Sequence, residues 1–205
     1  DRLRSRGLGD VYKRQTLDEA NWVITSYMIA NAILIPLTGW LENLLGRMKF
    51  LKIFISLFTL GSVVCAFSHS LNMMVLGRLI QGIGGGPMMP ISQAILIAAF
   101  PFEKRGQAMA LFAFAVMVFS IMGPTFGGFL VDNWSWQWIY LVNIPIGIFS
   151  IILVHCNVKD QENRVIPKKV DVVGLISLTL WLLTMQIVLD LSLIHISEPT
   201  RPEPI

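Results

Sequence analysis

Charged side chains are scarce in this chain of 205 residues. Asp, Glu, Lys and Arg make up 14% of it, where soluble domains average about 25%. Apolar residues make up 54% and gather into long runs with almost no charge. Such a chain is organised by membrane spans rather than by soluble domains. The net charge of +3 is divided among short loops, so it does not indicate binding to nucleic acid.

Catalytic and metal-binding patterns are missing as well. The sequence has no glycine-rich phosphate loop, no metal-ligand spacing, and no serine and histidine placed to share a pocket. Cys65 and Cys156 fall in different apolar segments, so each is expected to be a small packing residue. His69 and His155 lie at segment ends, where an interfacial position is favoured over proton relay. We therefore expect neither an enzyme nor a bound cofactor.

Six apolar segments reach or approach the roughly 17–25 residues that a membrane-spanning helix needs. They are Trp22–Leu41, Phe50–Phe67, Leu71–Phe100, Ala108–Val131, Trp138–Val154 and Val172–Leu189. The third is long enough to tilt or protrude. No acidic residue lies deep inside any of them, because Asp171 and Asp190 bracket the sixth and Asp132 lies in a loop. These segments predict an all-α integral membrane protein.

Basic residues occupy every second loop between these segments. They are Arg47, Lys49 and Lys52 in the first loop, Lys104 and Arg105 in the third, and Lys159, Arg164, Lys168 and Lys169 in the fifth. The second and fourth loops have no Lys or Arg. By the positive-inside rule the odd-numbered loops are cytoplasmic. The first segment then runs from outside to inside.

The ends of the chain differ from its middle. Residues 1–15 and 191–205 match no span and resemble translated adapter sequence, so we set them apart as foreign-looking tails. The basic residues of the first tail conflict with an external start for the first segment. The conflict disappears if that tail is foreign and one further span is missing upstream.

The fourth segment contains a glycine–proline pair and two further glycines, in Gly123-Pro124-Thr125-Phe126-Gly127-Gly128. In a soluble helix such a proline costs roughly 3 kcal/mol and each glycine about 1 kcal/mol. In a bilayer the same residues are tolerated, because neighbouring helices satisfy the freed backbone groups. Gly123 and Gly127 share one face and allow another helix to approach closely. The pattern predicts a bendable membrane helix.

This segment and the next resemble the fifth and sixth helices of major facilitator superfamily drug:proton antiporters, most closely the fourteen-helix EmrB/QacA multidrug efflux family. The antiporter motif G-P-x-x-G-G is matched by Gly123, Pro124, Gly127 and Gly128. W-x-W-I-Y-L-V-N-I-P-I-G follows it, with an interfacial belt of Trp134, Trp136 and Trp138. The resemblance runs from about Thr16 to Asp190.

The resemblance implies a helical-bundle fold and a domain division. The six segments match transmembrane helices 2–7 of the family. Residues 16–156 are expected to form the amino-terminal bundle without its first helix, residues 157–170 a cytoplasmic loop, and residues 171–190 the seventh helix.

The first loop, residues 39–47, resembles the superfamily's G-x-L-x-D-x-x-G-R loop between helices two and three. The matching residues are Gly39, Leu41, Gly46 and Arg47. In the family this loop latches the cytoplasmic side through charge contacts, but here Asn43 replaces the acid and puts part of that latch in doubt. The alternative is a tight turn with a topogenic arginine.

Arg78 is the only basic residue deep inside a predicted span, since Lys52 lies at the very start of the second. Burying a cation there costs from about 2.5 kcal/mol upward, so such residues are usually paired and functional. The polar and small residues that share its face are Gln81, Gly82, Gly85, Met89, Ser92 and Gln93. Arg78-x-x-Gln81-Gly82 also resembles the helix-four motif whose arginine is implicated in proton coupling. The alternative is that Arg78 extends outward to the interface.

The first segment carries a polar stripe made by Tyr27, Asn31, Thr38 and Glu42. Polar residues at membrane depth face protein or water, so the stripe marks a candidate substrate cavity. With the polar face of the third segment, the candidate lining residues are Tyr27, Asn31, Met89 and Gln93. Asn31 suits a bond to a neighbouring helix equally well. The candidates for an adaptable apolar wall are Met88, Met89, Phe112 and Met117, for which plain packing is the alternative.

The resemblance implies a secondary active transporter that exports amphipathic drug-like compounds in exchange for protons, by rocking of two halves around a midplane cavity. It implies a multi-pass protein of the inner (plasma) membrane that uses the proton gradient and no cofactor. The expected partners are amphipathic small molecules, protons, the lipid bilayer, the missing remainder of the transporter, and a periplasmic adaptor with an outer-membrane channel. The alternatives are an exporter of another solute, such as a metabolite or siderophore, and a non-transporting scaffold or channel piece.

Overall fold

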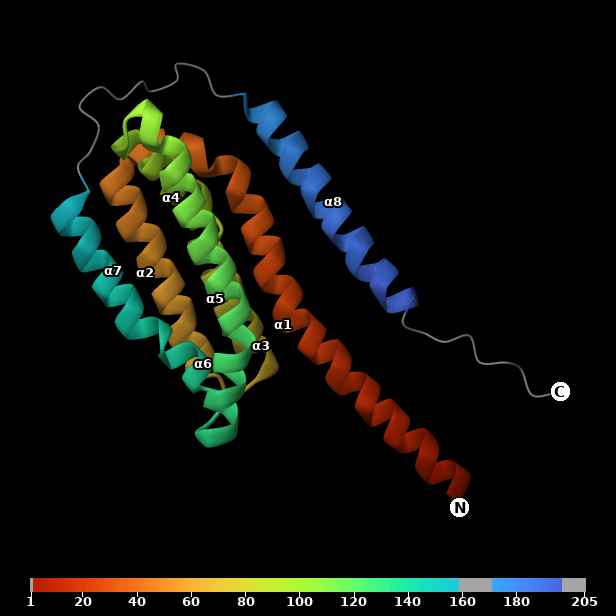
Figure 1. The fold of residues 1–205 in the computed structure, drawn as a ribbon. Coiled ribbons are helices and arrows are strands. Elements are labelled where there is room, and N and C mark those ends of the chain that lie inside the picture. The colour runs from red at the N-terminus through yellow and green to blue at the C-terminus, as the bar shows by residue number, and fades with distance from the viewer. Residues whose placement is uncertain (1, 159–170, 197–205) are drawn as a thin grey trace.

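The computed structural model describes residues 2–158 and 171–196, and within them every regular element is helical. The elements are α1 (Arg2–Leu45), α2 (Arg47–Ala66), α3 (Leu71–Gly85), α4 (Met88–Ala99), the 3-10 turn η1 (Phe102–Lys104), α5 (Arg105–Asn133), α6 (Trp138–Leu141), α7 (Asn143–Asn157) and α8 (Val172–Ile196). Figure 1 shows them as a bundle with α8 lying beside α1. The predicted cytoplasmic residues Lys159, Arg164, Lys168 and Lys169 lie outside the described residues.

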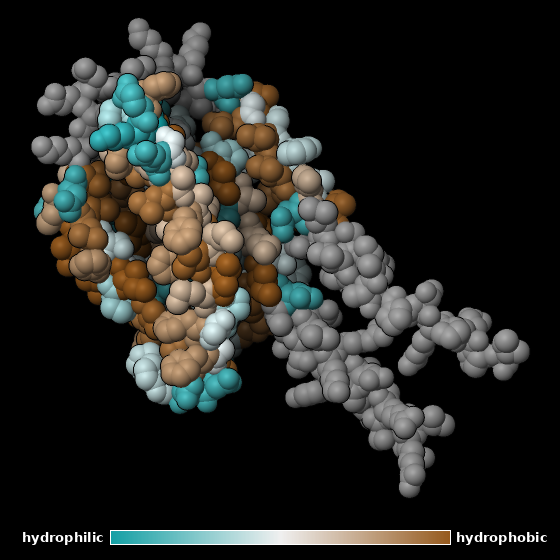
Figure 2. All heavy atoms as spheres, in the orientation of Figure 1, coloured by the Kyte–Doolittle hydropathy of each residue, from teal (hydrophilic) through white to brown (hydrophobic). Residues whose placement is uncertain are grey.

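Five stretches of the described chain are long and apolar enough to cross a membrane. They are Asn21–Leu45, Arg47–Ala66, Leu71–Ala99, Phe102–Asn133 and Trp138–Asn157. The sixth predicted segment is also helical, but its apolar part in the described residues, Val173–Val188, is shorter than these spans. On the face shown in Figure 2, hydrophilic residues gather mainly at the two ends and hydrophobic residues lie between them. This is the surface that a bilayer requires.

Prolines break two of the predicted segments. The third segment is divided at Gly86 and Pro87, and the fifth at Val142. Proline has no N–H to donate to the preceding turn, so it is best placed at the start of a helix. Pro87 precedes α4 and Pro145 lies in the first turn of α7. By contrast, α5 continues through Pro124.

The boundary predicted after residue 15 is not marked by a break, because α1 runs from Arg2 to Leu45 with Pro36 inside it. At the other end α8 continues to Ile196, and residues 197–205 lie outside the described residues. The division into a transporter portion and foreign tails therefore stays a prediction.

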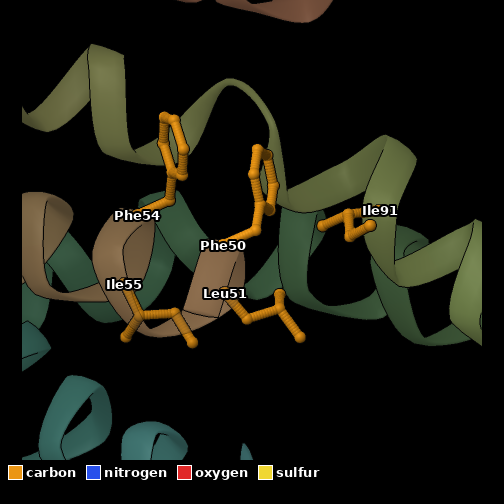
Figure 3. Packing of buried hydrophobic residues seen from close by; sticks show 5 residues of the cluster. All are labelled: Phe50, Leu51, Phe54, Ile55 and Ile91. Carbon is orange, nitrogen blue, oxygen red and sulfur yellow. The ribbon is translucent and has the colours of Figure 1, made fainter. Parts of the chain in front are cut away.

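The most tightly packed part of the bundle centres on α2. Figure 3 shows a buried cluster made by Phe50, Leu51, Phe54, Ile55 and Ile91. A side chain at Gly84 of α3 would collide with the α2 backbone at Phe54 and Phe58, so these two helices pack backbone against backbone. In α5, by contrast, only Ala108 and Leu130 are buried. The bundle thus holds α3 firmly and leaves α5 at its surface.

The loops alternate between the two ends of the bundle. The α1–α2 and α4–α5 junctions lie at the upper end in Figure 1, and the α2–α3 and α5–α6 junctions at the lower end. The charge pattern therefore predicts that Arg47 and Lys104 are cytoplasmic and that His69 and Asn133 are external.

Single-cysteine labelling checks this orientation. We expect Asn133→Cys, in a background with Cys65 and Cys156 replaced, to react with an impermeant maleimide in intact cells. Lys104→Cys should react only after permeabilisation. The reverse pattern of labelling would show that the topology is inverted.

Candidate functional site

The turn between α1 and α2 is built on Gly46 and Arg47. Gly46 has φ 84°, the left-handed conformation that side chains disfavour, and it is the only residue with positive φ among those described. Arg47 follows immediately, and its Nε donates to Oε1 of Glu42 at 2.8 Å. Both side chains are less than a fifth exposed. The glycine therefore turns the chain so that the arginine folds back onto the end of α1.

The motif's acidic residue is replaced by Asn43, and this turn partly compensates for that replacement. Asn43 is exposed, and the partly buried Glu42 supplies the carboxylate for Arg47 instead. Leu41 packs against the α2 cluster, whereas nothing described lies within 4 Å of a side chain added at Gly39. A charged contact thus closes the loop, and its role in gating stays a prediction.

Arg78 is held inside the bundle rather than extended to the interface. Its NH1 group donates to Oε1 of Gln81 at 3.0 Å. Its guanidinium carbon lies 4.9 Å from the ring centroid of Tyr140 and 5.8 Å from that of Tyr27. Cation–π contacts of this kind strengthen when water is excluded. Three helices therefore surround the one cation that the described spans carry at depth.

Gln81 connects the arginine to α2. Its side chain is 2% exposed, and its Nε2 donates to Oγ of Ser62 at 2.7 Å. Because a guanidinium only donates, the amide oxygen must face Arg78 and the amide nitrogen must face Ser62. Gly82 beside it has no room for a side chain, since an added Cβ would lie 2.6 Å from the carbonyl oxygen of Tyr27. This glycine allows α1 to reach the arginine.

Sequence reasoning missed three residues around this arginine. They are Ser62 of α2, Tyr140 of α6 and Asn143 of α7, whose Nδ2 donates to Oγ of Ser62 at 3.4 Å. The signal that was present is Gln137, Tyr140 and Asn143 at three-residue steps in an apolar stretch. Such spacing places them on one helical face.

The four residues predicted to line a substrate cavity are brought together. Tyr27, Asn31, Met89 and Gln93 border one cavity of about 460 Å³. The α3–α4 break contributes Gly86 to its wall, and Met88 also lines it. Phe112 and Met117, predicted for the same apolar wall, lie on α5 and are not among the lining residues. The role of the cavity in binding stays a prediction.

Tyr27 joins the cavity to the arginine. It lines the cavity on one side and presents its ring to Arg78 on the other. Asn31, one helical turn further along α1, has a buried Oδ1 without a hydrogen-bond partner in the described residues. Buried polar atoms are normally paired, so this atom marks the polar part of the cavity wall.

The glycines of α5 differ from those of α3. A side chain added at Gly123, Gly127 or Gly128 would meet nothing within 4 Å in the described residues. Pro124 lies between them inside an unbroken helix. Within the described part of the chain, no neighbouring helix therefore packs closely against these three glycines of the predicted antiporter motif.

These features define a helical membrane protein with a cation inside the bundle, connected through Tyr27 to a cavity. A model of the Major Facilitator Superfamily matches residues 11–194, and the chain belongs to that superfamily. It is a multi-pass protein of the inner (plasma) membrane, in a superfamily of transporters rather than enzymes.

Individual curated proteins are also similar in sequence to this chain. The chain is 41% identical over 175 residues to the "Multidrug export protein EmrB" of Escherichia coli, covering 85% of this chain and 34% of that protein. It is 37% identical over 172 residues to the "Fatty acid resistance protein FarB" of Neisseria gonorrhoeae, covering 84% and 34%. It is 33% identical over 177 residues to "Multidrug resistance protein 3" of Bacillus subtilis, covering 86% and 34%. The chain thus spans about a third of the length of these relatives.

Proposed function

We propose that the chain forms part of a secondary transporter that exports amphipathic drug-like compounds in exchange for protons. The observation that carries the proposal is the position of Tyr27, which borders the cavity and faces the partly buried guanidinium of Arg78. One side chain therefore touches both the expected substrate space and the expected coupling charge. The names of the relatives support the same function.

In the proposed mechanism, the positive charge of Arg78 influences the movement of protons through the transporter. A substrate in the cavity occupies the wall formed by Asn31, Met89 and Gln93, and alternating access exposes that wall to each side in turn. No Asp or Glu lies at membrane depth in the described spans. We therefore expect the proton-carrying carboxylate in the part of the transporter that this chain does not cover.

A second cargo is favoured by one relative. The name of the Neisseria gonorrhoeae protein indicates fatty acids, which are amphipathic carboxylates. Arg78 supplies a positive charge within the described spans, and its Nε is buried without a partner there. An anionic amphipath is therefore the alternative substrate class.

Everted vesicles that contain the full-length protein distinguish these possibilities. After respiration has acidified the lumen, we expect a lipophilic cationic dye to release protons in proportion to its transport. A medium-chain fatty acid added instead tests the alternative cargo. Vesicles treated with an uncoupler are the control. Proton release by neither compound, with the protein inserted and folded, would contradict the proposal.

A further inference from the structure

One face of α6 and α7 is directed at the helices that hold Arg78. Gln137 and Leu141 are joined by a helical hydrogen bond of 3.0 Å, so Gln137 and Tyr140 belong to one turn. Tyr140 is 7% exposed and lies against the guanidinium. Asn143, three residues on, donates to Ser62. Gly147 continues the face and packs against Thr59 of α2.

Two sets of contacts connect this face to Arg78. The first is the ring of Tyr140, at 4.9 Å from the guanidinium carbon. The second passes from Asn143 to Ser62, from Ser62 to Gln81, and from Gln81 to Arg78. The hydroxyl of Ser62 donates to the carbonyl oxygen of Phe58 at 3.0 Å, so its lone pairs remain free to accept from the two amides.

Two buried polar groups in this region have no hydrogen-bond partner among the described residues. Nε of Arg78 is a buried donor without an acceptor, and Oε1 of Gln137 is a buried acceptor without a donor. Gln137 lies one turn before Tyr140, whose ring contacts Arg78. Buried groups of this kind are rarely left unpaired in a stable state.

We propose that Tyr140 and Asn143 are positioning residues for Arg78, and that α6 and α7 set where its charge lies during the transport cycle. The contact itself is independent of the proposed function, whereas its role in transport rests on that function. The one-residue interruption at Val142, ahead of Pro145, lies between the two supports.

The external loop is connected to this arrangement. Trp136 lies edge-on to Tyr140, with ring centroids 6.2 Å apart and an interplanar angle of 83°. Trp136 thus connects the predicted external loop to the ring that faces the guanidinium.

A double-mutant cycle on stability tests the contact without reference to transport. In detergent-induced unfolding of the full-length protein, we expect the effects of Tyr140→Leu and Arg78→Ala to be non-additive. The unfolding equilibrium constant of the double variant should differ about tenfold from the value that the two single variants predict, equivalent to about 1.4 kcal/mol. The control is Phe149→Leu, which removes an aromatic ring that is 60% exposed on α7. Additive effects of Tyr140→Leu and Arg78→Ala would overturn the contact.

Transport measurements test the positioning role. We expect Tyr140→Leu to lower proton-coupled export about tenfold, and Tyr140→Phe, which keeps the ring, to restore most of that loss. In the Arg78→Lys background Tyr140→Leu should have a much smaller effect. Export by Tyr140→Leu at the wild-type rate would overturn the role. A wild-type protein that exports nothing would refute the proposed function instead, and the stability cycle would still decide the contact.

Discussion

Replacing Arg78 with alanine in the full-length protein should abolish proton-coupled export while leaving the protein inserted in the membrane. The guanidinium is held between Tyr27 and Tyr140 and bonded to Gln81. Its removal deletes the positive charge that we expect to influence proton movement during transport. It also removes the cost of keeping a cation out of water, which offsets part of the lost contacts. Coupling should therefore suffer far more than assembly.

Arg78→Lys should be partly active at best. An ammonium lacks the planar set of donors that reaches Gln81 while the flat face stacks on an aromatic ring. The matched control is Arg105→Ala, which removes an arginine of the predicted cytoplasmic loop whose Nε donates to the carbonyl oxygen of Phe100. Efflux of a dye and proton release are measured for each variant at equal expression. Wild-type coupled efflux in Arg78→Ala would show that the cation has no part in coupling.

The helical fold could be predicted from the sequence because membrane spans leave a strong local signal. Length, hydropathy and the distribution of Lys and Arg are properties of neighbouring residues, so they need no tertiary information. Five spans and the alternation of loops between the two ends follow this pattern in the structure. The interruptions at Pro87 and Val142 were not predicted, because a proline does not always interrupt a helix, as Pro36 and Pro124 show.

The partners of the functional residues could not be predicted in the same way. Arg78 and its face were visible from three- and four-residue spacing, but its contacts Tyr140 and Ser62 lie on other helices. Which residues meet across a helix pair depends on crossing angle and depth, and here on how closely Gly77 and Gly84 let α2 approach α3. The pairing of Arg47 with Glu42, rather than with a residue at position 43, likewise depended on the turn at Gly46.

Two glycines show most clearly that contacts between helices could not be predicted from the sequence. In the sequence, Gly84 of α3 and Gly127 of α5 are both small residues in an apolar helix. In the structure a side chain at Gly84 would strike the backbone of α2, while one at Gly127 would meet nothing within 4 Å in the described residues. The same residue type therefore serves internal packing in one helix and an open surface in the other.

This difference leads to a prediction for Gly127→Leu in the full-length protein. We expect the variant to insert normally and bind drug, but to lose tightly coupled export or to leak protons. The resemblance to antiporters implies that α5 meets the carboxy-terminal half of the transporter, with the contact sealing one side of the cavity. A leucine at that contact would hold the two halves apart, because packed interfaces absorb added volume only at a cost of about 1–3 kcal/mol.

The competing explanation is that Gly127 packs helices within the amino-terminal bundle. No described residue lies within 4 Å of a side chain added there, and Gly84→Leu supplies the matched control for a glycine that does pack against a neighbouring helix. Gly84→Leu should sharply lower the thermal stability of the detergent-solubilised protein, since α2 and α3 cannot separate without exposing the cluster around Phe54. Gly127→Leu should leave that stability nearly unchanged and raise the proton leak of everted vesicles. If Gly127→Leu instead loses stability as Gly84→Leu does, with a normal proton leak, the glycine serves internal packing and the gating role of α5 is refuted.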